Sequence, residues 1–136
     1  MPSQGGFIMT TKRFCNEELG TTELYTEVWL TETVRVKDVD DLLVENHYWR
    51  DSDGELWNDF DDPMENVKRA FDAYRTRKGY MSPAEIRNLR ESTDFSDSRF
   101  ADALGLASSI VSEIEQNRRV QDEHQEDLFR SVGNDC

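Results

Sequence analysis

Residues 96–116 read SDSRFADALGLASSIVSEIEQ, two short apolar segments on either side of Gly105. Phe100, Ala101 and Leu104 recur with the period of one helix face, and the second segment repeats that spacing with branched side chains. The stretch therefore predicts a short helix, a tight glycine turn and a second short helix. That order is typical of a helix-turn-helix, which presents its second helix to a DNA groove. A plain helical bundle with one glycine turn is the alternative. The branched side chains are Ile110, Val111 and Ile114.

Helix signals continue upstream of this stretch. Ser82-Pro83-Ala84-Glu85 is a capping box, which predicts that a helix begins there. Before it, a helical pattern runs from Asp62-Pro63 through a basic cluster to Gly79, and we expect a linking helix over residues 62–79. Residues 80–132 then form the predicted helix-turn-helix domain.

The N-terminal half has a period of two instead of the helical period. From residue 23 to 37, apolar side chains occupy even positions, which predicts a strand buried on its even face. Two turn signals then separate two further short strands, so residues 21–61 are expected to form a small antiparallel β-rich domain and the whole chain an α+β fold. Residues 1–20 are expected to be a flexible N-terminus, in which Met9 is a candidate start behind a tag remnant. The even apolar positions are Leu24, Val28, Leu30, Val34 and Val36.

The charge of the chain narrows the classes of function. Among 136 residues, 29 are acidic and 16 are basic, a formal net charge of −13 at pH 7. Residues 81–136 alone hold six basic and twelve acidic side chains. Such a surface repels phosphate backbones and anionic membranes, and no run of about 18 apolar residues occurs that could span one. Cys15 and Cys136 lie near opposite ends, which argues against a disulfide scaffold and for a reducing cytoplasm.

Four runs of sequence carry a family resemblance. Residues 66–75 (NVKRAFDAYR), 82–91 (SPAEIRNLRE), 100–105 (FADALG) and 115–121 (EQNRRVQ) together resemble the lambda-repressor and Cro-type (XRE) helix-turn-helix family. More narrowly, they are similar to the C-terminal half of MqsA-like antitoxins and related phage-associated regulators, over about residues 62–130. The resemblance implies a regulator that binds operator DNA through a dimer and whose N-terminal unit masks a toxin.

Relatives of this kind usually carry an N-terminal zinc site made of two C-x-x-C pairs. Of the first pair only Cys15 is present, with Glu18 in the partner position, and Arg50 and Asp53 stand in place of the second pair. A structural zinc ion needs four good nitrogen or sulfur donors. We therefore expect no zinc and no cofactor, and a sheet held by its own aromatic side chains. These are Trp29, Tyr48, Trp49 and Trp57.

The positions that contact DNA in the family depart from its pattern. Asp97 stands where a glutamine commonly touches phosphate, and Glu113 stands where an arginine is common. Residues for the bidentate arginine–guanine and glutamine–adenine pairs are missing. Serine hydroxyls are then left to contact the bases. Arginines, with Arg87 and Arg90 nearby, are left to contact phosphates. The predicted DNA-binding residues are Ser98, Arg99, Ser108, Ser109, Ser112, Glu113, Arg118 and Arg119.

Two hypotheses of function remain open. The first is a helix-turn-helix transcriptional regulator that binds operator DNA and a toxin or another protein partner. The second is an acidic protein-binding inhibitor or DNA mimic, for example a phage anti-CRISPR, that targets a basic nucleic-acid enzyme. Its motivation is the negative charge of the domain that should be basic. The predicted partner-binding residues are Asp51, Asp53, Asp59, Asp61 and Asp62.

An enzyme is not expected. His47 and His124 are the only histidines, no nucleophile pattern accompanies them, and no glycine-rich phosphate loop occurs. A homodimer is a separate hypothesis. Leu128, Phe129 and Val132 form either a helical seam between two copies or part of the domain's own core.

Overall fold

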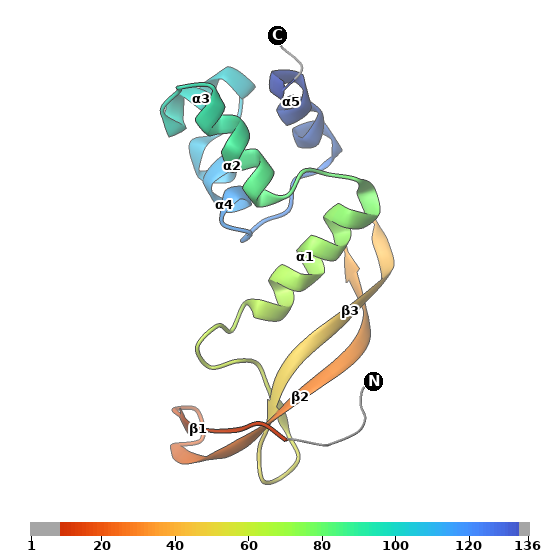
Figure 1. The fold of residues 1–136 in the computed structure, drawn as a ribbon, viewed down its shortest axis with the longest axis vertical. Helices are drawn as coiled ribbons and strands as arrows, with labels where there is room; N and C mark the ends of the chain where they lie inside the picture. The colour runs from red at the N-terminus through yellow and green to blue at the C-terminus, as the bar shows by residue number, and fades with distance from the viewer. Residues whose placement is uncertain (1–8, 134–136) are drawn as a thin grey trace. The chain divides into compact units, whose positions relative to one another are not determined.

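The computed structural model describes residues 9–133 and has an α+β fold. Within this range a four-stranded antiparallel sheet comes first and five helices follow (Figure 1). The chain divides into two compact units, with the boundary between Arg69 and Ala70. The elements are β1 (Thr11–Asn16), β2 (Thr21–Val36), β3 (Val39–Arg50), β4 (Leu56–Trp57), α1 (Glu65–Lys78), α2 (Pro83–Ser92), α3 (Asp97–Leu104), α4 (Ser108–Glu115) and α5 (Glu123–Gly133).

The strands of the first unit lie side by side in the order in which they occur in the sequence. β2 and β3 form a long hairpin in which Trp29 pairs with His47, and the short β4 places Trp57 opposite Trp49. Directly opposite residues point to the same face of a sheet. The register therefore brings His47, Trp49 and Trp57 to one face.

β1 corrects the expectation of a flexible terminus over residues 1–20. Thr11–Asn16 pairs with β2, and within it Phe14 and Asn16 are buried while Cys15 is exposed. The Asn16 side chain accepts the backbone N–H groups of Glu18 and Leu19 and thereby holds the turn into β2. The alternation was too short to stand out in the sequence. Residues 1–8 lie outside the described range.

The buried face of β2 also differs from the prediction. Tyr25, at an odd position, is fully buried, whereas Leu24 is 54% exposed. The reason is an aromatic core on the odd face, where Phe14 contacts Tyr25 and Trp49 edge to face. Of the expected aromatic set, Trp49 is in this core and Trp57 packs against it, but Trp29 is half exposed.

Local signals at the helix ends are confirmed. Ser82 and Glu85 form the capping box at the start of α2, and Ser96 caps α3 by accepting the N–H of Arg99. Gly105 ends α3 in the left-handed conformation at a φ of 75°, and Asn117 has a φ of 58° after α4. The linking helix α1 is shorter than the predicted range 62–79, because its first residue is Glu65.

The second unit is built around one apolar core. It includes the predicted apolar side chains of α3 and α4, together with Ile86 of α2 and Phe129 of α5. Phe129 is fully buried, and Leu128 and Val132 pack against the same cluster. These three side chains therefore close the core of their own unit. The buried residues of this core are Ile86, Phe100, Ala101, Leu104, Val111, Ile114 and Phe129.

Among the described residues, every helix is too short or too polar to cross a lipid bilayer.

Candidate functional site

The exposed side of α4 carries hydroxyl groups. Ser108, Ser109 and Ser112 are exposed, and we call these three residues the serine surface. Val111 and Ile114, on the opposite side of the helix, are buried in the core and fix its orientation within the second unit. Ala107 precedes the helix and has no side-chain acceptor, so the first turn of α4 lacks a side-chain cap. This end of the helix carries partial positive charge.

The carboxylates around the serine surface are paired with arginines. Arg90 donates from Nε and Nη2 to Glu115 at 2.8 and 2.9 Å, and its Nη1 lies 2.9 Å from Asp97. The hydrogen bonds that Arg90 donates to Glu115 raise the pKa of Arg90 above its ordinary value. Glu113 accepts from Nε of Arg119 at 2.8 Å. Asp97 and Glu113 thus each form an ion pair with an arginine of the chain.

A polar cavity of about 230 Å³ lies beside the serine surface. It is walled by α2, α3 and α4, so that serine hydroxyls and guanidinium groups face the same hollow. The polar side chains that line it include Arg87, Arg90, Asp97, Ser108, Ser112 and Gln116.

Two of the predicted arginines keep their charge at the surface. Arg118 is exposed, its Nη1 lies 3.4 Å from Oε1 of Gln116, and among the described residues no carboxylate forms an ion pair with it. Arg99 lies over the ring of Phe95, with its guanidinium carbon 4.7 Å from the ring centroid, and Ser98 beside it is exposed. The predicted DNA-binding residues therefore lie on α3, on α4 and directly after α4.

A buried arginine holds the segment that carries Arg118. Arg75 of α1 is 3% exposed, and burial lowers its pKa. Its guanidinium donates to Oε1 of Gln121 at 2.9 Å, to Oδ1 of Asn117 at 2.6 Å and to the carbonyl of Arg119 at 2.9 Å. The sequence indicated Arg75 only as a basic residue at a helix end. These three partners lie more than 40 positions away, so no local pattern could reveal this role.

The same network continues into α5. Gln121 is fully buried and donates to the carbonyl of Met81 and to Glu126. Glu126 also accepts the N–H of Met81 and Nε of Arg130. A chain of satisfied buried polar groups thus ties α1, the segment after α4, the start of α2 and α5 together, and such networks specify one arrangement of a core.

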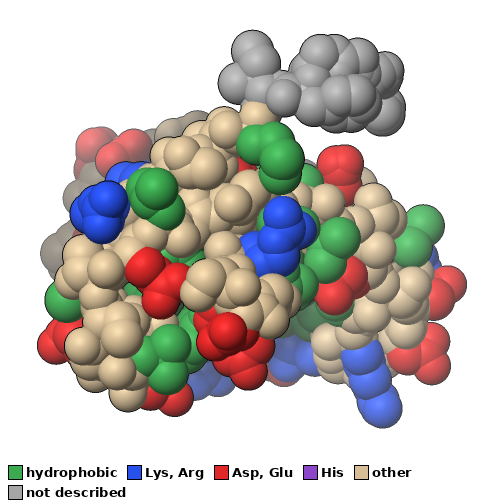
Figure 2. Space-filling model, turned by 90° about the horizontal axis from the view of Figure 1, so that it is seen from below, with side chains coloured by type: hydrophobic (Ala, Val, Ile, Leu, Met, Phe, Trp, Pro, Cys, Tyr) green, Lys and Arg blue, Asp and Glu red, His purple; other side chains and the backbone are tan. Residues whose placement is uncertain are grey.

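The predicted partner-binding aspartates divide into two groups. Asp51 and Asp59 accept hydrogen bonds from tryptophans of the sheet. The indole N–H of Trp57 donates to Asp51 and lowers the pKa of this carboxyl, and the indole N–H of Trp49 donates to Asp59. The other three are exposed. Figure 2 shows one face on which acidic side chains are dispersed among hydrophobic and basic ones and do not merge into one acidic patch. The exposed aspartates are Asp53, Asp61 and Asp62.

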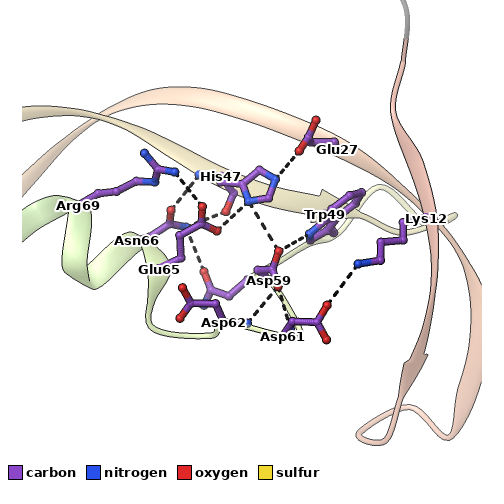
Figure 3. A network of polar contacts seen from close by, with 11 residues as sticks. Lys12, Glu27, His47, Trp49, Asp59, Asp61, Asp62, Glu65, Asn66 and Arg69 are labelled. Atoms are coloured by element: carbon purple, nitrogen blue, oxygen red, sulfur yellow. Dashed lines mark hydrogen bonds and ion pairs between the residues drawn. The ribbon is translucent and has the colours of Figure 1, made fainter. Parts of the chain in front are cut away.

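A buried histidine in the first unit is surrounded by carboxylates (Figure 3). Nε2 of His47 lies 2.7 Å from Glu27, and Nδ1 lies 2.7 Å from Glu65 and 3.9 Å from Asp59. Burial lowers the pKa of His47, but its hydrogen bonds to the carboxylates of Glu65 and Glu27 and the charges of these groups outweigh burial, so the pKa is raised overall. We call His47, Glu27, Asp59 and Glu65 the histidine cluster.

Further contacts hold His47 and Glu65 at the join of β3 and α1. The side chain of Asn66 both accepts the N–H and donates to the carbonyl of His47, each at 2.8 Å. Arg69 donates to Glu65 at 2.8 Å, and the ring of Trp29 stacks on His47 at 4.5 Å between centroids. The sequence predicted only a strand histidine. In a chain with 29 acidic residues, nothing local marks the few that converge on it.

Comparisons of the chain with family models, with curated proteins and with solved structures found no match.

Proposed function

We propose that α3, the Gly105 turn and α4 act as a helix-turn-helix and that the protein is a DNA-binding transcriptional regulator, antitoxin-like or phage-associated. The observation that carries this proposal is the chemistry of α4. Its exposed side presents the uncharged serine surface, while Glu113 and Glu115 are held by arginines. A helix placed in a major groove needs such hydrogen-bonding groups and must not present bare carboxylates to phosphates.

In this proposal the serine hydroxyls read base edges and the surrounding groups hold the DNA backbone. Serine can donate to or accept from a base, so it gives weaker discrimination than a bidentate arginine or glutamine. Arg118 is exposed and placed directly after α4, where it can contact phosphate, and the positive end of α4 favours an anion as well. The buried contacts of Arg75 hold Arg118 and its neighbours in place before DNA binds.

The acidic surface supports a second candidate function, binding of a basic protein such as a toxin or a nucleic-acid enzyme. Its basis is the net charge of −13 and the exposure of Asp53, Asp61 and Asp62. Opposite charges steer such a partner to the surface and raise the association rate. A regulator that also binds a basic protein through its acidic surface would combine both functions in one chain.

Selection from a random double-stranded DNA library with the full chain tests the first candidate. We expect enrichment of one motif, bound more weakly by Arg118→Ala. Each phosphate contact contributes about 0.9 to the slope of log affinity against log salt, so this variant should reduce the slope by about one. Arg13→Ala, which removes an exposed arginine of β1, is the charge-matched control and should change neither quantity. No enrichment, together with capture of a basic protein that is lost on charge reversal of the exposed aspartates, would favour the second candidate.

A further inference from the structure

We propose that the histidine cluster is a binding site for one divalent transition-metal ion, zinc in the first instance, with His47, Asp59 and Glu65 as its ligands. One nitrogen and two oxygens from these side chains lie within 4.8 Å of one another. Imidazole with carboxylates is a donor set that zinc, cobalt and manganese accept. None of the three residues occupies a position of the missing C-x-x-C cysteines, so this is a different site from the one that the family resemblance suggested.

The distances fit a metal ion between the three groups. With metal–ligand bonds of about 2.0–2.2 Å, two ligands of a tetrahedral ion lie about 3.3–3.6 Å apart. From Nδ1 of His47, Glu65 lies closer than this at 2.7 Å and Asp59 lies slightly farther at 3.9 Å. Asp59 and Glu65 are both partly exposed, and their side chains would have to rotate to reach this spacing. Three protein ligands leave the fourth position for water.

The surroundings of the three ligands are those that metal sites use. Glu27 lies 2.7 Å from Nε2 of His47 and would keep a proton on that nitrogen, while a metal ion would replace the proton that Nδ1 donates to Glu65. Asp59 is held by the indole of Trp49 and by two backbone N–H groups, and Glu65 by Arg69. Carboxylate–histidine–metal arrangements of this kind orient the ligand and increase its basicity.

The charges of the cluster also favour a divalent ion. Glu27, Asp59 and Glu65 carry three negative charges against the one positive charge of Arg69. A divalent ion balances these charges, and it would join β3, the loop before α1 and α1 at one point (Figure 3).

Cobalt provides the direct test, because a four-coordinate Co²⁺ ion absorbs visible light. The probe is Co²⁺ added to tag-free, chelator-treated full chain, followed by displacement with Zn²⁺. We expect one bound ion per chain, an intense visible band, and loss of that band in Asp59→Asn and in Glu65→Gln. Glu27→Gln should weaken binding about 10- to 100-fold, as is typical when a partner of a metal-bound histidine is removed.

Two controls separate this site from other donors. His124→Gln removes an exposed histidine of α5 and Cys15→Ser removes the exposed thiol, and both should leave the band unchanged. If ligand variants fail to fold, Mn²⁺ added to the wild-type chain should broaden the amide NMR signals around His47, Asp59 and Glu65 first. Absence of binding, binding that survives both carboxylate substitutions, or broadening centred elsewhere would overturn the proposal.

Discussion

Replacement of Arg75 by methionine should destabilise the second unit strongly. The substitution keeps an unbranched side chain in α1 but removes the guanidinium that donates to Gln121, Asn117 and the carbonyl of Arg119. A hydrogen bond to a charged group contributes about 1.5–3 kcal/mol, so three of them set an upper range of about 5–9 kcal/mol. The guanidinium no longer has to be desolvated, which offsets part of the loss. We expect a net decrease of about 3–5 kcal/mol in the free energy of unfolding.

Urea denaturation followed by circular dichroism measures this change. The transition of the second unit should move to lower urea concentration with little change in slope, because the surface exposed on unfolding stays similar. Arg118→Met is the matched control: it removes an exposed guanidinium from the adjoining segment and should cost less than about 0.5 kcal/mol. An Arg75→Met variant within about 1 kcal/mol of the wild type would show that the buried network does not hold this unit together.

Three further predictions concern single side chains. Glu113→Gln should increase DNA affinity several-fold in fluorescence anisotropy, because Arg119 is released to contact phosphate; a decrease would contradict the proposed role of that pair. The indole of Trp57 lowers the pKa of Asp51 below its ordinary value of 3.8, so the stabilisation from this carboxylate is present above that value and is lost as the pH falls through the lower folded pKa. Asp51→Asn should therefore flatten the acid limb of stability below about pH 4 in urea titrations, and an unchanged limb would refute this assignment. Ser82→Ala should lower the free energy of unfolding by about 1 kcal/mol in thermal unfolding, and an unchanged value would mean that the capping box does not contribute to stability.

Features set within one helical turn could be predicted from the sequence. The cap at Ser82, the left-handed Gly105 and the left-handed Asn117 after α4 depend on residues only a few positions apart. The α+β class, and the order of the strands and helices apart from β1, followed from periodicity. The functional interpretation of α3 and α4 goes beyond these local rules and stays a proposal.

Features that depend on distant partners could not be predicted. The even face of β2 looked apolar, but Tyr25 on the odd face found Phe14 of β1, a strand that the sequence pattern had left out. The contacts of Arg75 and of the histidine cluster could not be predicted for a related reason, because a sequence with many charged residues does not show which of them lie close together. Burial of His47 among carboxylates needs the pairing of β2 with β3 and the start of α1 in place.

The central claim is that the serine surface of α4 contacts the bases of a specific DNA sequence. Its most direct test is NMR: the selected duplex is titrated into the uniformly ¹⁵N-labelled full chain and amide shifts are recorded. We predict the largest shifts at Ser108, Ser109 and Ser112, with smaller ones at Arg118. Shifts confined to the sheet unit, or no shifts at duplex concentrations above that of the protein, would contradict the claim.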